Sequence, residues 1–92
     1  MGYFVYIVES ISTGKRYVGH TDDLDRRVAE HNCPEHNPRK YTSRNSGPWK
    51  LIHHEQYPTR SEAMKREKWL KSSIGRQWII ESIGRASPPK AD

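Results

Sequence analysis

The chain has 92 residues, of which about a third are hydrophobic, so it can form one small domain with a modest core. Its single cysteine, Cys33, excludes an intrachain disulfide and a cysteine-based zinc site. No stretch is apolar for long enough to span a membrane and none resembles a signal peptide, so we expect an intracellular, cytoplasmic protein.

The charge balance of the chain is basic. The formal net charge is +5 and the isoelectric point is near 9.6, with basic residues spread through the second half. A small basic domain that also carries aromatic side chains favours a polyanionic partner, nucleic acid first. From charge alone, a basic surface that serves only to keep the domain in solution is equally consistent with the sequence.

A hairpin is predicted at the start of the chain. Residues 3–9 are rich in β-branched and aromatic side chains and predict a central strand. Residues 12–15 predict a turn, and residues 16–20 predict the partner strand of the hairpin. Gly19 lies on the same face of that strand as Tyr17 and leaves room for a ligand. If the register permits, Tyr17 and Tyr6 face one cleft.

A helix is predicted next, capped by Thr21 or Asp22 and running to about Asn32. Leu24 and Val28 form its narrow apolar stripe.

Beside that stripe, Arg27 and His31 are four residues apart and border core and solvent, as residues that line a cleft do. The plainer alternative for Arg27 is a surface ion pair with Asp23.

Residues 33–48 hold three prolines and no periodicity, which predicts a long loop. Its cations and aromatic side chain are typical of a nucleic-acid contact, although a loop without such a role is about as consistent with the sequence. The candidate substrate-binding residues here are Arg39, Lys40, Tyr41 and Arg44.

The second half predicts a strand over 49–57 and a helix from Arg60 to about Ser73, capped by Thr59 and ended by Gly75. An amphipathic segment begins at residues 77–80, and residues 85–92 read as a flexible tail. We therefore expect a single α/β (α+β) domain over residues 1–84, a three-stranded sheet flanked by helices in the order β-β-α-β-α-α.

Glu67 falls on the stripe of the predicted helix that also holds Ala63, Leu70 and Ile74. A buried, unpaired carboxylate costs several kcal/mol, so Glu67 needs an arginine or a metal ion as its partner. An ion pair with Arg27 or Arg66 is the structural alternative to a metal site.

The ordered set Val5-Tyr6-Ile7, Tyr17-Val18-Gly19, Arg27, His31 and Glu67 resembles the GIY-YIG nuclease superfamily over roughly residues 3 to 80. The small stand-alone bacterial members are the most similar, sharing Tyr41-Thr42 and the run Ser61-Glu62-Ala63 before Glu67. Two positions depart from the pattern. Phe4 stands where the family name has glycine, and for the late polar residue of many members Gln77 is only a candidate.

The resemblance implies a metal-dependent endonuclease that hydrolyses DNA phosphodiester bonds in repair, recombination or processing. It assigns Tyr6 as general base, which requires the phenol pKa to fall about 3 units from its usual value near ~10, through the field of a metal and Arg27. Tyr17 would bind a phosphate oxygen or hold Tyr6 in place, and Arg27 would clamp the scissile phosphate. His31 would relay protons.

The resemblance further implies that Glu67 holds one weakly bound Mg²⁺ or Mn²⁺, with His20 as an additional phosphate contact. A protein partner could supply substrate specificity. Two other functions stay open: a nucleic-acid-binding module that cleaves little or nothing alone, and an interaction module whose basic face meets an acidic protein.

Overall fold

The structure is a computed structural model that describes residues 2–32 and 48–84. The predicted order of elements and the α+β class are confirmed. The elements are β1 (Tyr3–Ser10), β2 (Arg16–Thr21), α1 (Leu24–His31), β3 (Trp49–Tyr57), α3 (Arg60–Lys71) and α4 (Ser73–Ser82). Residues 33–47 of the predicted loop and the predicted tail lie outside the described residues.

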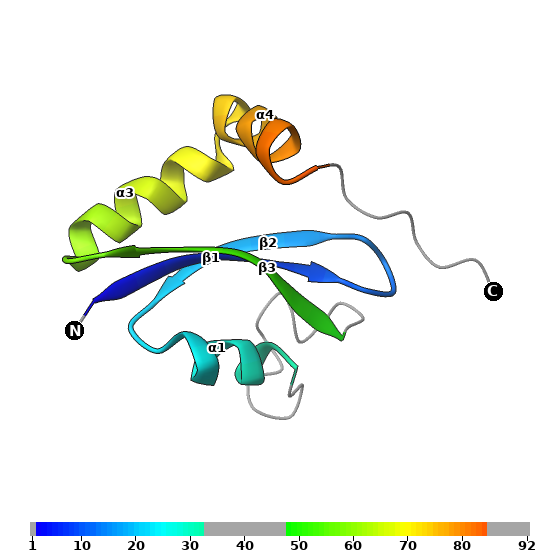
Figure 1. The fold of residues 1–92 in the computed structure, drawn as a ribbon, viewed down its shortest axis with the longest axis horizontal. Coiled ribbons are helices and arrows are strands. Elements are labelled where there is room, and N and C mark those ends of the chain that lie inside the picture. The colour runs from blue at the N-terminus through cyan, green and yellow to red at the C-terminus, as the bar shows by residue number, and fades with distance from the viewer. Residues whose placement is uncertain (1, 33–47, 85–92) are drawn as a thin grey trace.

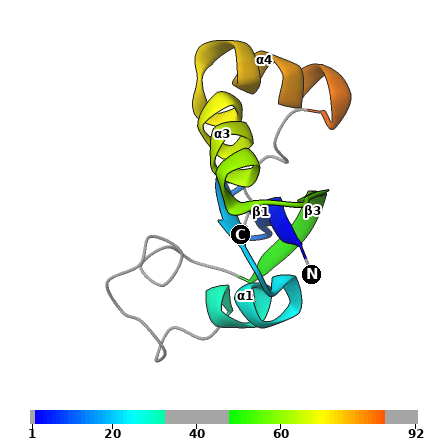
Figure 2. The ribbon, with the colours of Figure 1, turned by 90° about the vertical axis from the view of Figure 1, so that its left-hand side faces the viewer.

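The three strands form an antiparallel sheet in the order β2-β1-β3. β1 is the central strand because its run from Val5 to Val8 is apolar on both faces, and all four of these residues are fully buried. Helix α1 covers one face of the sheet, and α3 and α4 cover the other (Figures 1 and 2). The domain therefore has three layers and a core on each side of β1.

The two cores divide the side chains of β1 by their alternation along the strand. Val5 and Ile7 pack with Ala63, Leu70 and Ile79 of α3 and α4.

On the other face, Tyr6 and Val8 pack with Trp49 of β3, and Leu24 and Val28 of α1 lie against them, as the predicted stripe requires. Strand β1 therefore packs against both helical layers of the domain.

The cap of α1 differs from the prediction. The carboxylate of Asp23, rather than Thr21 or Asp22, accepts a hydrogen bond from the backbone N–H of Arg26 at 3.1 Å. Thr21 is the last residue of β2, and its hydroxyl instead accepts from the backbone N–H of Asp23 at 3.1 Å, which closes the turn into the helix.

The other end of α1 is joined to β3 by Asn32. Its amide donates to the carbonyl of Trp49 at 3.0 Å and accepts from the Trp49 backbone N–H at 2.6 Å. This pair of hydrogen bonds fixes the end of the helix against the sheet.

The boundary between α3 and α4 also differs from the prediction. Thr59 caps α3 as expected, but α3 ends at Lys71 because Ser72 is extended and its hydroxyl caps α4. Ile74 therefore leaves the stripe of α3 and is 71% exposed. Gly75 lies inside α4 rather than ending a helix. A glycine is needed there because a Cβ would collide with the backbone of Trp69 and Leu70.

Of the helices that the structure describes, none combines the length and apolar character needed to cross a bilayer.

Candidate active site

The register of the hairpin places the two candidate tyrosines in one cluster. Tyr6 pairs with Gly19 across the strands, and Tyr17 lies two residues from Gly19 on the same face. The rings of Tyr6 and Tyr17 have centroids 6.4 Å apart. A Cβ on Gly19 would lie 2.5 Å from the Tyr6 hydroxyl, so the glycine makes room for that group.

Helix α1 delivers the next two candidates to the Tyr6 hydroxyl. His31, which is 4% exposed, places Nε2 at 2.8 Å from the phenol oxygen, and Arg27 donates to that oxygen from Nε at 3.3 Å. Arg27 pairs with Glu30 at 3.0 Å rather than with Asp23. Glu30 therefore orients the guanidinium of Arg27, whose Nε faces Tyr6.

Glu67 lies on the other face of the sheet and has partners that the sequence did not predict. Its carboxylate contacts Nδ1 of His20 and accepts from Nζ of Lys71 at 2.6 Å. Arg66 instead forms a two-pronged pair with Glu55 at 2.9 and 3.1 Å. The predicted alternative of a Glu67–arginine bridge is therefore wrong, because Arg66 pairs with Glu55 of β3 and Arg27 pairs with Glu30.

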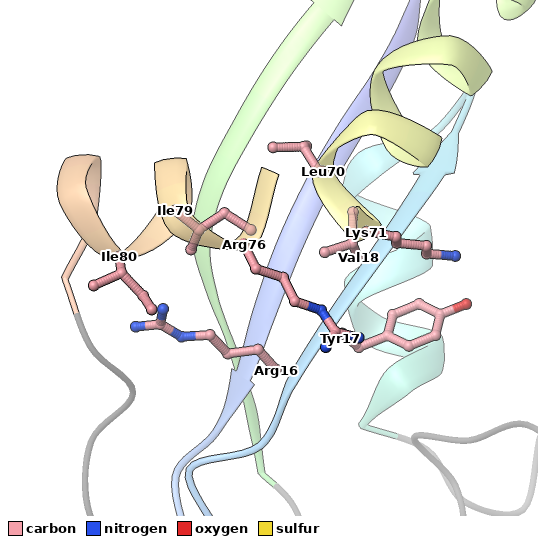
Figure 3. Close-up of a pocket in the computed structure, with 8 residues that line it drawn as sticks. All are labelled: Arg16, Tyr17, Val18, Leu70, Lys71, Arg76, Ile79 and Ile80. Atoms are coloured by element: carbon pink, nitrogen blue, oxygen red, sulfur yellow. The ribbon is translucent and has the colours of Figure 1, made fainter. Parts of the chain in front are cut away.

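The candidate residues lie on both faces of β2, which is an edge strand of the sheet. Gly19 and Tyr17 face α1, whereas His20 pairs with Val5 and faces α3. Lys71 links the residues of the two faces, with Nζ 5.8 Å from the centroid of the Tyr17 ring, beside which it lies in Figure 3. The five candidates Tyr6, Tyr17, Arg27, His31 and Glu67 therefore gather around one edge of the sheet.

The electrostatics of Tyr6 differ from the expectation for a free general base. Burial raises the pKa of Tyr6 to about 12, and the nearby Tyr17 and Glu67 act in the same direction. The hydrogen bond from Arg27 lowers the pKa but does not outweigh burial. Among the groups present, Tyr6 is therefore a neutral phenol at neutral pH.

Ion pairs favour the charged forms of Glu67 and Arg27. Burial alone would raise the pKa of Glu67, but hydrogen bonds from Lys71 and His20 outweigh it and lower that pKa. Burial likewise opposes the charge of Arg27, yet contacts with Tyr6 and Glu30 leave its pKa raised. The site therefore holds a fixed cation on one face of β2 and a fixed anion on the other.

The remaining predicted residues differ in whether the structure describes them. Arg39, Lys40, Tyr41 and Arg44 lie outside the described residues. Gln77 is exposed on α4, and within the described part of the chain no hydrogen bond connects it to the five candidates.

Residues 2–32 and 48–84 contain no group of three or more side chains suited to hold a metal ion. Glu67 by itself nevertheless offers a hard carboxylate at the centre of the cluster, and Mg²⁺ commonly binds through one or two carboxylates while keeping most of its waters. The donor chemistry of Glu67 therefore fits a hydrated divalent ion.

Glu30 and Lys71 pair with candidate residues but were not predicted from the sequence, although their spacing pointed to these pairs. Glu30 is three residues after Arg27, and Lys71 is four residues after Glu67, and both spacings bring opposite charges together on a helix. Such pairs are common on solvated helix faces, so the spacing alone did not single them out.

Comparison with known proteins identifies the family. The model of the GIY-YIG catalytic domain matches residues 2–77. The chain is 47% identical to a UPF0213 protein of Haloquadratum walsbyi over 76% of this chain and 74% of that protein. It is 41% identical to a UPF0213 protein of Staphylococcus aureus over 76% of this chain and 80% of that protein.

A solved structure agrees with these matches. The solution NMR structure of a UPF0213 protein from Bacillus halodurans has a TM-score of 0.53 and 34% identity, covering 91% of this chain and 87% of that one. The matched region contains β1, β2, α1, β3 and α3, which carry all five candidate residues. The chain therefore belongs to the GIY-YIG catalytic domain family and has relatives in the UPF0213 group.

Proposed function

We propose that this protein is a metal-dependent endonuclease that hydrolyses phosphodiester bonds of DNA. The observation that carries the proposal is the contact of the Tyr6 hydroxyl with both His31 and Arg27, at an edge strand whose other face presents Glu67. Membership of a nuclease family supports the same activity. A role in DNA repair or processing, and a protein partner that selects the substrate, belong to this proposal.

Phosphodiester hydrolysis requires a group that neutralises the charge developing on the phosphorus oxygens. Arg27 suits this role because its planar guanidinium can donate to two oxygens of one phosphate. Its Nη1 is tied to Glu30 and its Nε to Tyr6, so the fork is oriented before substrate arrives. A phosphate bound there would lie beside the Tyr6 hydroxyl.

The attacking water must lose a proton, and the high pKa of Tyr6 argues against a standing phenolate. We assign Tyr6 and His31 to a relay instead. Arg27 donates to the phenol oxygen, and when His31 carries its proton on Nδ1 the phenol donates to Nε2. As the water proton moves to the phenol oxygen, the phenol proton passes to Nε2 of the imidazole. Tyr6 stays neutral throughout.

Glu67 is the residue that would hold the divalent ion, after its pair with Lys71 opens. A bound Mg²⁺ or Mn²⁺ supplies positive charge that stabilises the transition state and the leaving oxygen. Lys71 is then free to contact a phosphate of the same strand, and Tyr17 can donate to a phosphate oxygen from the opposite side of β2. His20 keeps the carboxylate of Glu67 in place.

One observation favours a second function. Glu67 already contacts Lys71 and His20, Arg27 pairs with Glu30, and Tyr6 is protonated, so the charges of the cluster are paired without a substrate. A nucleic-acid-binding module with little or no cleavage of its own would also fit that balance. An interaction module for an acidic protein would differ from both in its salt dependence, since binding to duplex DNA weakens with a slope near −0.9 per neutralised phosphate.

The deciding experiment is cleavage of labelled branched, flapped, single-stranded and duplex DNA with Mg²⁺ or Mn²⁺, using wild type, Tyr6→Phe and Glu67→Ala. We expect cleavage that needs the metal and is lost in both variants. Binding of DNA without cleavage by wild type would support the binding module. Cleavage by Glu67→Ala at the wild-type rate would refute the metal assignment.

A further inference from the structure

A pocket of about 740 Å³ opens directly beside the candidate active site. It lies where the end of α3 and the start of α4 pass over the edge strand β2 (Figure 3). Tyr17 and Lys71 belong both to the cluster around β2 and to the wall of this pocket. A ligand in the pocket would therefore contact two residues of the candidate active site, Tyr17 and Lys71.

The floor of the pocket is apolar. Val18 of β2, Leu70 of α3 and Ile79 and Ile80 of α4 line it. Leu70 and Ile79 are buried parts of the core, whereas Ile80 is 38% exposed and forms part of the accessible wall. An apolar surface of this kind suits the flat face of a nucleobase, and the volume lies within the range of about 300–1,000 Å³ usual for small-molecule sites.

The rim of the pocket is cationic. Arg16, Lys71 and Arg76 come from β2, α3 and α4, and no carboxylate is present among the described residues that line the pocket. Arg16 is held by Glu9 and by the carbonyl of Gly84, so its charge is already balanced. Lys71 pairs with Glu67.

Arg76 differs from these two cations. It is exposed, and its guanidinium forms no ion pair or hydrogen bond with another described residue. Its charge is therefore available for a phosphate, and in Figure 3 its side chain extends across the pocket toward Tyr17.

From this combination we propose that the pocket holds one unpaired nucleotide of the DNA strand that is cut, its base on the apolar floor and its phosphate at Arg76. The proposal rests on the proposed function, because it takes the neighbouring phosphate to be the scissile one. A paired base cannot enter a pocket, so this site would select DNA with an unpaired nucleotide next to the cleavage point. The sheet-edge cluster would supply chemistry and the pocket would supply structural preference.

The test is a binding measurement that does not depend on cleavage. Fluorescence anisotropy with a metal chelator present would compare a flapped DNA with a fully paired duplex of the same length. We expect wild type to bind the flapped DNA several-fold more tightly than the duplex. Arg76→Gln should weaken flap binding about tenfold, the scale of one lost charge-assisted hydrogen bond, and should weaken duplex binding by less than about twofold.

Matched controls come from other faces of the same helices. Arg60→Gln removes the same charge from the far end of α3, and Ile74→Ser truncates an exposed isoleucine of α4 that does not line this pocket. We expect both to bind like wild type, whereas Ile80→Ser should weaken flap binding about fivefold. Arg76 and Ile80 are exposed, so their variants should fold, which circular dichroism would check.

Each other outcome counts against the proposal in a defined way. Equal losses in Arg76→Gln and Arg60→Gln, or equal effects of Ile80→Ser and Ile74→Ser, would reduce the pocket to general charge or apolar surface. Displacement of the flap by an equal concentration of a free mononucleotide would assign the pocket to free nucleotides instead. If the pocket variants lose flap binding but wild type cleaves no DNA, the pocket proposal stands and the nuclease proposal is refuted. If wild type cleaves DNA but the pocket variants bind the flap normally, the nuclease proposal stands and the pocket proposal is refuted.

Discussion

The Tyr6 hydroxyl lies 2.8 Å from Nε2 of His31, and this contact joins the central strand β1 to the last residue of α1. Both side chains are buried, so neither can turn to water without breaking the layer between sheet and helix. The orientation of the phenol is thus set by the packing of the domain. The proposed proton relay depends on this contact, which the cap of α1 at Asp23 and the hydrogen bonds of Asn32 to Trp49 hold in place.

Gly19→Ala tests how tightly the Tyr6 ring is held. The new Cβ would lie 2.5 Å from the hydroxyl and 2.8 Å from Cζ of Tyr6, so the ring must shift. We expect a loss of about 1–3 kcal/mol in the free energy of unfolding and a fall in cleavage of about 100-fold. Thermal or urea unfolding and single-turnover cleavage would measure the two effects.

The double variant Gly19→Ala with Tyr6→Phe serves as the control. Removing the hydroxyl relieves part of the overlap, so the two stability losses should be less than additive. Full additivity would show that the glycine is needed for another reason.

Arg27→Lys should lower the rate of cleavage by about 10²–10³-fold, since an ammonium group lacks the planar fork that presents parallel N–H groups to two oxygens of one phosphate. Arg26→Lys is the matched control because Arg26 is exposed on the same helix and contacts Asp22. Its rate should stay within about twofold of wild type. Similar losses in both variants would make Arg27 one cation among many. Turnover at saturating DNA separates this effect from weaker binding.

Glu67→Gln should lower metal-dependent cleavage by about 100-fold or more, because the amide keeps the size of the side chain and loses its charge. DNA binding should change less than about threefold. Glu62→Gln, an exposed carboxylate on the same helix, should cleave like wild type. A titration of Mg²⁺ for each variant would check the assignment, and an unchanged metal requirement in Glu67→Gln would move the ion to another residue.

Acid should destabilise the protein through Glu55. Burial alone would raise the pKa of this carboxyl, but hydrogen bonds from Arg66, Tyr57 and His53 outweigh it and lower the pKa from 4.5 to about 2. Because the folded-state pKa is depressed, the stabilisation is present above pH 4.5 and is lost as pH falls toward 2. The side chain keeps some contact with water, so we expect a loss of about 1–2 kcal/mol over that range.

Urea unfolding between pH 5 and pH 2 measures this loss, with Glu55→Gln beside wild type. The variant should be less stable at pH 5 and should show a flatter dependence on pH. A parallel pH dependence in the two proteins would assign acid sensitivity to other carboxylates.

Much of the fold followed from local patterns. The β-branched run around Tyr6, the turn at Gly14 and the cap at Thr59 depend on interactions within a few residues, and each was read correctly from the sequence. The break after Lys71 was missed, since a serine that ends one helix and caps the next has the same composition as an exposed helical position. Gly75 was misread for a related reason, because its role depends on a backbone that approaches from α3.

The sequence by itself determined the family, the order of elements and the five residues that were expected to act together, because these depend on residue type and spacing. Only the tertiary structure decided their partners: His20 and Lys71 for Glu67, Glu30 for Arg27, and His31 for Tyr6. Burial also raised the pKa of Tyr6 where the resemblance implied that it should fall. Ion pairs and desolvation depend on distances across the sheet, and those distances are set by packing between segments far apart in the chain.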